Sequence, residues 1–161
     1  MFGGEKVKGI SKRVGVGVLS LMFLLALVSA SPVVAKVPLR WDVSAAYDGV
    51  VTWNGDVYAE DGSHGVFTLT VLDAVFLSNV QHSICIWRID WGDDVYIEGT
   101  ALGTFVYTTT PLNMMDGGDY VFNGEVTYAS PEWSYLVGRN THVMGHVTPW
   151  PWTTEGVLQI N

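Results

Sequence analysis

Cysteine is almost absent from this sequence: Cys85 is the only one in 161 residues. A single thiol excludes an intrachain disulfide, so a folded domain must be stabilised by its apolar core. Cys85 lies in the run Ser83-Ile84-Cys85-Ile86-Trp87, where alternate residues of a strand would face that core. We therefore predict that Cys85 is a buried small apolar residue, with pairing to another chain as the alternative.

Long apolar runs occur only within the first 35 residues. Basic residues at positions 6, 8, 12 and 13 precede an apolar run at 14–28, and small residues follow, which is the order of a secretory signal peptide. Cleavage is expected after Ala35, with Ala30 as a second candidate. The alternative is a retained anchor over 14–35, since about 20 apolar residues span a bilayer, although Pro32 would interrupt such a helix.

We accordingly expect residues 1–35 to be a signal peptide and residues 36–161 to be a single domain, a size that suits one core. The expected location is secreted or extracytoplasmic, and the cell surface if the segment is kept. The membrane would then be only a transient partner, through the signal peptide.

Basic charge is scarce in residues 36–161, which hold four Lys and Arg against fifteen Asp and Glu, a net charge of −11. Phosphate backbones are bound through Lys and Arg. Nucleic acid is therefore not expected as a partner, and neither is an anionic membrane surface. The excess of acidic residues would keep a secreted domain soluble or favour the binding of metal ions.

Helical periodicity is also missing, because from residue 37 onward short apolar stretches alternate with period two between Gly, Asn and Asp. This pattern predicts an all-β meander. Ten strands are predicted, at residues 38–46, 50–53, 56–60, 66–72, 84–90, 95–98, 102–109, 120–129, 141–148 and 156–160, with short helical fragments at 73–80 and 131–137. A small antiparallel β-barrel is preferred to a two-sheet β-sandwich, because sequential hairpins and glycines inside strands suit a curved sheet.

The strand rhythm is similar to that of lipocalin-like and allene-oxide-cyclase-like barrels in general layout. The resemblance implies a lipocalin-like meander. It assigns no family, since no G-x-W motif lies near the start of the mature chain and layout alone does not establish function.

The dipeptide Asn-Gly occurs twice between β-rich stretches, as Asn54-Gly55 and Asn123-Gly124. Asn-Gly favours a type I′ hairpin turn, which we predict at the first position. At the second position, residues 120–128 can also form one continuous strand with a bulge or bend at Gly124. In that case the inward residues would be Tyr120, Phe122, Val126 and Tyr128.

No metal-binding motif is present. His142 and His146 would share one face of a helix, but in a strand they lie roughly 13 Å apart, too far to bind one ion together. They are expected either on a solvated face or, with Met144 between them, on the interior face. The acidic clusters at 90–94 and 116–119 are predicted as turns. We expect no metal and no cofactor.

Tryptophan is abundant, with seven residues in the chain. Trp150 and Trp152 flank Pro151, so their segment cannot be a central strand. Their rings could stack on a sugar or hold an apolar ligand. Alternatively, they could fold over an open barrel end and fill its core.

Familiar catalytic motifs are missing: the sequence has no G-x-S-x-G, no H-E-x-x-H and no phosphate-binding glycine loop. Glu98 and Glu125 could in principle form an acid–base pair, but the sequence does not determine their separation. An enzyme is therefore expected less than a binding protein.

The predicted function is a binding module for a small apolar or carbohydrate ligand, with a pocket of several hundred cubic ångströms. The candidate ligand-binding residues are Trp150, Trp152, His142, Met144, His146 and Tyr128. The alternatives are a cell-surface or matrix subunit that self-associates through its terminal strands, and a small carboxylate-dependent hydrolase or isomerase.

Overall fold

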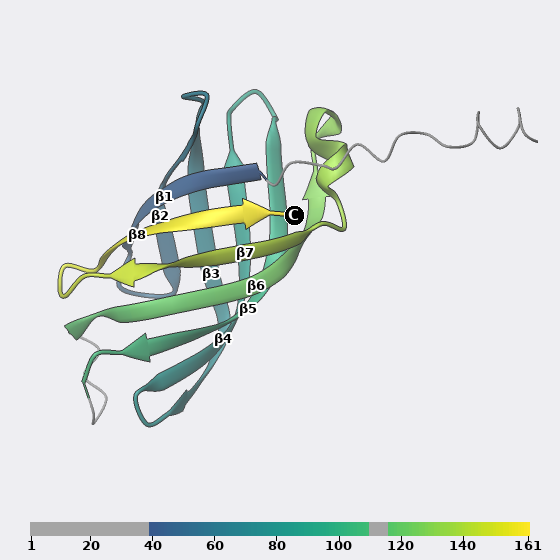
Figure 1. Ribbon diagram of the computed structural model, residues 1–161. Coiled ribbons are helices and arrows are strands. Elements are labelled where there is room, and N and C mark those ends of the chain that lie inside the picture. The colour runs from purple at the N-terminus through teal and green to yellow at the C-terminus, as the bar shows by residue number, and fades with distance from the viewer. Residues whose placement is uncertain (1–38, 110–115) are drawn as a thin grey trace, which may run out of the picture. The chain divides into compact units, whose positions relative to one another are not determined.

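The computed structural model describes residues 39–109 and 116–161, which form eight antiparallel strands closed into a barrel in chain order (Figure 1). The strands are β1 (Leu39–Tyr47), β2 (Thr52–Ala59), β3 (His64–Leu77), β4 (Val80–Asp90), β5 (Tyr96–Tyr107), β6 (Gly118–Ala129), β7 (Asn140–Val147) and β8 (Thr153–Ile160). β1 pairs with β8 and closes the sheet. The prediction of an all-β barrel is confirmed. The predicted signal peptide and its cleavage site at Ala35 lie outside the described residues.

The barrel has eight strands rather than ten because two pairs of predicted strands are continuous. Asn54 and Gly55 lie in the middle of β2, so the predicted hairpin turn is wrong. A Cβ atom on Gly55 would lie 1.9 Å from the carbonyl oxygen of Ser44 on β1. Glycine is therefore required here for the close approach of two strands, and not for a turn.

β6 is one continuous strand, as the second interpretation of residues 120–128 predicted. Tyr120, Phe122 and Val126 face the interior. The register against β5 shifts between Glu98 and Gly99, which pair with Tyr128 and Val126 and leave Thr127 without a partner in the ladder. This bulge turns Tyr128 outward, where 47% of it is exposed, so its predicted inward position is wrong.

The helical fragment predicted at 73–80 is also wrong, because residues 73–77 continue β3 beyond a bulge between Val71 and Asp73. The turn to β4 is made by Ser78 and Asn79, and Ser78 has a φ of 58°. The helical fragment predicted at 131–137 is confirmed as the 3-10 helix η2 (Pro131–Leu136).

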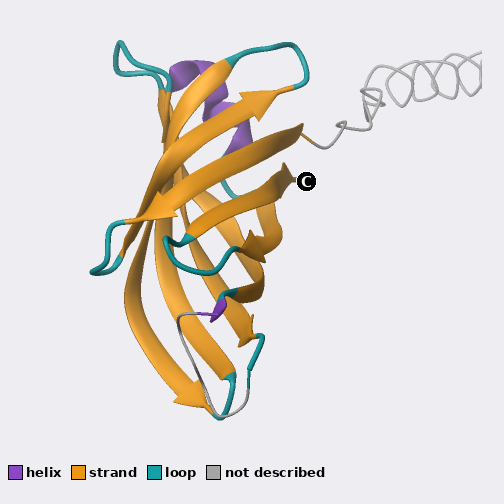
Figure 2. Ribbon diagram, turned by 90° about the vertical axis from the view of Figure 1, so that its left-hand side faces the viewer, coloured by secondary structure: helices purple, strands orange, loops and turns teal. Residues whose placement is uncertain are grey.

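One end of the barrel, which we call the closed end, is filled by three tryptophans, one of which belongs to η2. Figure 2 shows the helix η2, in purple, at this end of the barrel. Trp41 is the third residue of β1, Trp91 follows β4 and Trp133 belongs to η2. The Trp91 and Trp133 rings stack with centroids 5.2 Å apart, and Trp41 lies 6.0 and 6.2 Å from them. Cys85 is fully buried in the adjoining core, as predicted.

Part of the outer surface is apolar. Ile84 on β4 pairs with Leu102 on β5, and both side chains point outward and are exposed. This part of β4 is apolar on both faces, because Ile84 and Ile86 are exposed while Cys85 and Trp87 between them are buried. No helix in the described part of the chain is long and apolar enough to cross a membrane.

Candidate ligand-binding cavity

A cavity of about 310 Å³ lies inside the barrel at the end opposite the tryptophan cluster. We call this the open end; it carries the connections β1–β2, β3–β4 and β7–β8. Side chains from all eight strands line the cavity. Val50, in the β1–β2 loop, lines it and is 71% exposed, so the cavity reaches the surface. Its volume agrees with the pocket size expected from the sequence.

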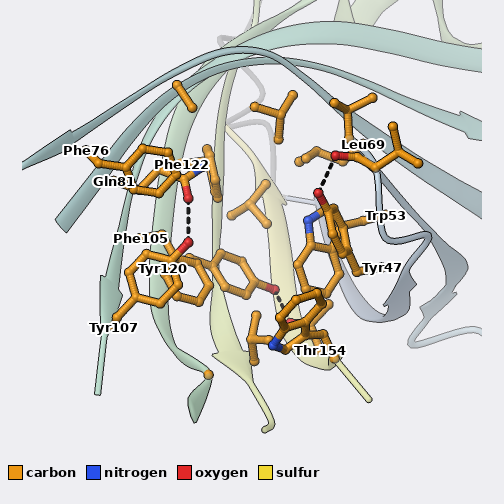
Figure 3. A pocket seen from close by; sticks show the side chains of 18 of the residues that line it. Tyr47, Trp53, Leu69, Phe76, Gln81, Phe105, Tyr107, Tyr120, Phe122 and Thr154 are labelled. Atoms are coloured by element: carbon orange, nitrogen blue, oxygen red, sulfur yellow. Dashed lines mark hydrogen bonds between the residues drawn. The ribbon is translucent and has the colours of Figure 1, made fainter. Parts of the chain in front are cut away.

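The wall of the cavity is mainly aromatic (Figure 3). Phe105 is the centre of one group of rings, with Tyr107 at 4.5 Å and Tyr120 at 6.5 Å between centroids. On the other side Tyr47 packs edge-on against Trp152 at 5.4 Å. The aromatic residues that line the cavity are Tyr47, Trp53, Phe67, Phe76, Phe105, Tyr107, Tyr120, Phe122 and Trp152. Such a wall offers ring faces and edges to an apolar guest.

Four polar side chains form two hydrogen-bonded pairs within this wall, and we call them the polar collar: Gln81, Tyr107, Tyr120 and Thr154. The Tyr107 hydroxyl donates to Gln81 Oε1 at 2.6 Å. The Tyr120 hydroxyl and Thr154 Oγ1 are hydrogen-bonded at 2.9 Å. Most of the polarity of the collar is therefore satisfied within the protein.

The tyrosines of the collar keep their protons over a wide pH range. Burial, with a smaller effect from Tyr47, raises the pKa of Tyr107 to about 12. Burial also raises the pKa of Tyr120, against the smaller opposing effect of its bond to Thr154. Both phenols are therefore neutral at physiological pH.

The polar side chains of the collar lie in the outer part of the cavity, and the deeper part is apolar. Gln81 is the second residue of β4 and Tyr107 is the last of β5, so both lie at the open end. Phe67 lies further inside, where it pairs with Ile89 on β4. A guest would therefore meet the polar collar around its outer part and aromatic or aliphatic carbon around its inner part.

Trp152 is the one predicted ligand-binding residue that lines the cavity. It also packs against the core, as the second interpretation of this residue predicted, while its contact with a ligand stays a prediction. Trp150 is 60% exposed and contacts Trp152 edge-on at 5.1 Å. Trp150 therefore stands outside the wall of the cavity and does not fill the core.

His142, Met144 and His146 lie on the outer face of β7, so the interior position that the sequence left open for them is wrong. His142 Nδ1 is 2.7 Å from Asn123 Oδ1, and His146 Nδ1 is 2.7 Å from Asp119 Oδ1. Met144 is 46% exposed. The inward residues of this strand are the alternating Thr141, Val143 and Val147. Tyr128 also faces outward, where it stacks on Tyr96 at 5.2 Å.

The predicted carboxylates are not in the cavity either. Glu98 lies on the outside, 3.7 Å from Arg88 Nη1, and Glu125 is exposed on β6. Asp90 begins the turn to β5, as predicted, and accepts hydrogen bonds from Arg88 and the Gly92 N–H, which lower its pKa. Within 39–109 and 116–161, no three His, Cys, Asp or Glu side chains gather as a metal site would require.

Sequence reasoning missed most of the aromatic wall. The wall could have been found from the alternation of side chains in a strand: once one residue is known to face inward, every second residue from it faces inward too. Phe105 and Tyr107 share one phase of β5, and Tyr120 and Phe122 share one phase of β6. The aromatic pairs at the open ends of these two adjacent strands mark the wall.

Comparison of the chain with family models, with curated proteins and with solved structures found no match.

Proposed function

We propose that this domain is a binding protein that holds one small, mainly apolar molecule in the cavity at the open end of the barrel. The observation that carries the proposal is the cavity itself: about 310 Å³ of space, open to the surface and lined mostly by aromatic and aliphatic side chains. Ligand pockets typically measure about 300 to 1,000 Å³ and combine apolar walls with a few polar groups.

An apolar ligand fits this cavity better than a carbohydrate does. A sugar carries many hydroxyl groups, each of which must find a partner when it leaves water. In each of the two polar pairs of the collar, the two side chains are already hydrogen-bonded to each other. The collar could therefore satisfy only a few hydroxyl groups of a guest.

The alternative functions have less support. Association through terminal strands requires free edges, but β1 and β8 pair with each other along their length. Acid–base catalysis by Glu98 and Glu125 requires a shared cleft, and neither residue lines the cavity.

Filling the cavity tests the proposal. Val143→Phe places a larger side chain at a buried position that lines the cavity. We expect it to weaken binding of the neutral fluorescent probe N-phenyl-1-naphthylamine at least tenfold, because the new ring takes the space of the guest. The matched control is Val121→Phe, the same change on the outer face of the neighbouring strand β6.

The measurement is a fluorescence titration, with circular dichroism to verify that both variants fold. Native mass spectrometry of the purified wild-type protein supplements it, since a mass lost on acid denaturation would reveal a resident ligand. Equal probe affinity in the two variants, or no binding by the wild type, would contradict the proposal.

The two tryptophans of the β7–β8 loop should behave differently. Trp152→Ala removes part of the cavity wall and should weaken probe binding about tenfold, because stacking surface is lost. Trp150→Ala should change the affinity less than twofold, since its ring lies outside the wall. The same titration checks both, and urea unfolding measures whether Trp152 also stabilises the empty barrel. Equal affinity losses would show that the loop acts as a unit.

A further inference from the structure

We propose that the ligand is an uncharged hydrophobe with a single hydroxyl group, bound with its carbon skeleton among the inner aromatic rings and its hydroxyl at the polar collar. This inference rests on the proposed function and adds the chemical class of the ligand and its orientation.

The absence of charge follows from the composition of the wall. None of the described residues that line the cavity is Asp, Glu, Lys, Arg or His. A charged group buried there would lose its hydration without gaining a counter-charge, which costs far more than a neutral polar group does. Asp48, in the β1–β2 loop, adds a negative charge near the mouth, where it accepts N–H bonds from Val50 and Val51. A carboxylate headgroup is therefore disfavoured both inside the cavity and at its mouth.

The choice of a hydroxyl follows from the hydrogen-bonding capacity that the collar has left. Thr154 Oγ1 lies 2.9 Å from the carbonyl oxygen of His146 and 2.9 Å from the Tyr120 hydroxyl. Thr154 carries a single hydroxyl proton, which it can give to only one of these two acceptors. With that proton on the carbonyl, the Tyr120 proton lies between the partners and the pair offers a guest oxygen lone pairs; with Thr154 donating to Tyr120, the Tyr120 proton is available as well. A hydroxyl group, which both donates and accepts, can bond to the pair in either arrangement.

The second pair of the collar, Tyr107 and Gln81, also has hydrogen-bonding capacity left for a guest. The Tyr107 proton is used on Gln81 Oε1, and Gln81 Nε2 donates one of its two protons to Ser83 Oγ at 2.7 Å. What remains is the phenol oxygen of Tyr107 as an acceptor and one N–H of Gln81 as a donor. A hydroxyl group can donate to a phenol oxygen and also accept from Gln81, whereas a carbonyl oxygen could use only that single N–H.

The position of the collar gives the orientation. Its four side chains lie near the open-end termini of β4, β5, β6 and β8, while Leu69 lies in the middle of β3 and Phe122 lies two residues further along β6 than Tyr120. Figure 3 shows these side chains around the cavity. A guest with its hydroxyl outermost would satisfy that group at the collar and place its carbon skeleton against the aromatic wall.

Three probes of the same ring size test the inference at pH 7: naphthalene, 2-naphthol and 2-naphthoate. Their affinities are measured by displacement of N-phenyl-1-naphthylamine. We expect 2-naphthol to bind about fivefold more tightly than naphthalene, which corresponds to one additional hydrogen bond. We expect 2-naphthoate to bind at least a hundredfold more weakly than 2-naphthol.

The variant Gln81→Leu/Tyr107→Phe removes both the donor and the acceptor that the hydroxyl would use at this pair, leaves no freed carbonyl oxygen in their place, and keeps the Tyr107 ring. It should bind naphthalene as the wild type does and lose the preference for 2-naphthol. The control Tyr58→Phe, on the outer face of β2, should keep that preference. If the double variant does not fold, each single variant should lose part of the preference.

Two results would overturn the inference: 2-naphthoate binding as tightly as 2-naphthol, and 2-naphthol binding no more tightly than naphthalene. In both cases the titration with N-phenyl-1-naphthylamine decides the proposed function separately. Binding of that probe retains the binding protein and rejects only the hydroxylated ligand, whereas its failure to bind rejects both.

Discussion

Replacing Trp41 with alanine is expected to lower the free energy of unfolding by about 3 to 5 kcal/mol, the usual cost of truncating a buried tryptophan. Trp41 is 3% exposed and contacts both Trp91 and Trp133. Because no disulfide stabilises the described barrel, the lost contacts and the new cavity must be offset by the rest of the core. Urea unfolding followed by tryptophan fluorescence and circular dichroism measures the effect.

The matched control is Trp150→Ala, the same substitution at the open end. Its ring is largely exposed, so the expected change in stability is within about 0.5 kcal/mol. A loss at Trp150 as large as that at Trp41 would show that the open end is also part of the stabilising core. The expected difference between the two variants would mean that the closed end contributes most of the stability, so that the open end can be used for binding.

The fold class was predictable because a barrel requires period-two alternation in nearly every strand, and that alternation is local. Strand ends were less predictable. Asn-Gly is a strong turn signal in an isolated hairpin, yet Gly124 lies inside β6, where a Cβ would come within 1.8 Å of the Thr100 carbonyl oxygen on β5. Glycine is required at this position because a neighbouring strand, distant in the sequence, passes close to it, and the local sequence does not show that contact.

The direction of side chains was predictable only where one phase of a strand is clearly apolar. In β7 the valines at 143 and 147 mark the inward phase and assign both histidines to the outside. In β6 the same rule holds as far as Val126. It fails at Tyr128, because a bulge whose partner residues are Glu98 and Gly99 reverses the alternation. Nothing in the local sequence marks that bulge.

The candidate site was the least predictable part, because it is built from the ends of strands distributed over the whole chain. Tyr107 and Gln81 meet only because β4 and β5 pair with Val80 opposite Val106. Tyr120 and Thr154 meet across β7, which separates their strands. Such contacts depend on the register of the barrel and cannot be derived from composition or motifs.

The second large effect concerns alkaline pH and the buried thiol. Burial raises the pKa of Cys85 from 9.0 to about 12, because a thiolate would lose its hydration in the core. In the unfolded chain the thiol titrates near its ordinary pKa. Between pH 9 and 12 the unfolded state therefore releases a proton that the folded state keeps, so rising pH favours unfolding.

Each unit of pH in this window removes up to about 1.4 kcal/mol from the free energy of unfolding. We expect the wild type to lose about 2 kcal/mol more than Cys85→Ala between pH 9 and pH 11, since the variant lacks the thiol while the other titrating groups are common to both. Urea unfolding at intervals of half a pH unit measures the two curves. Below pH 8 the curves should run parallel, separated only by the small packing cost of alanine. Parallel curves up to pH 11 would mean that water reaches Cys85 in the folded barrel, and the core between the cavity and the closed end would then be less tightly packed than its buried side chains indicate.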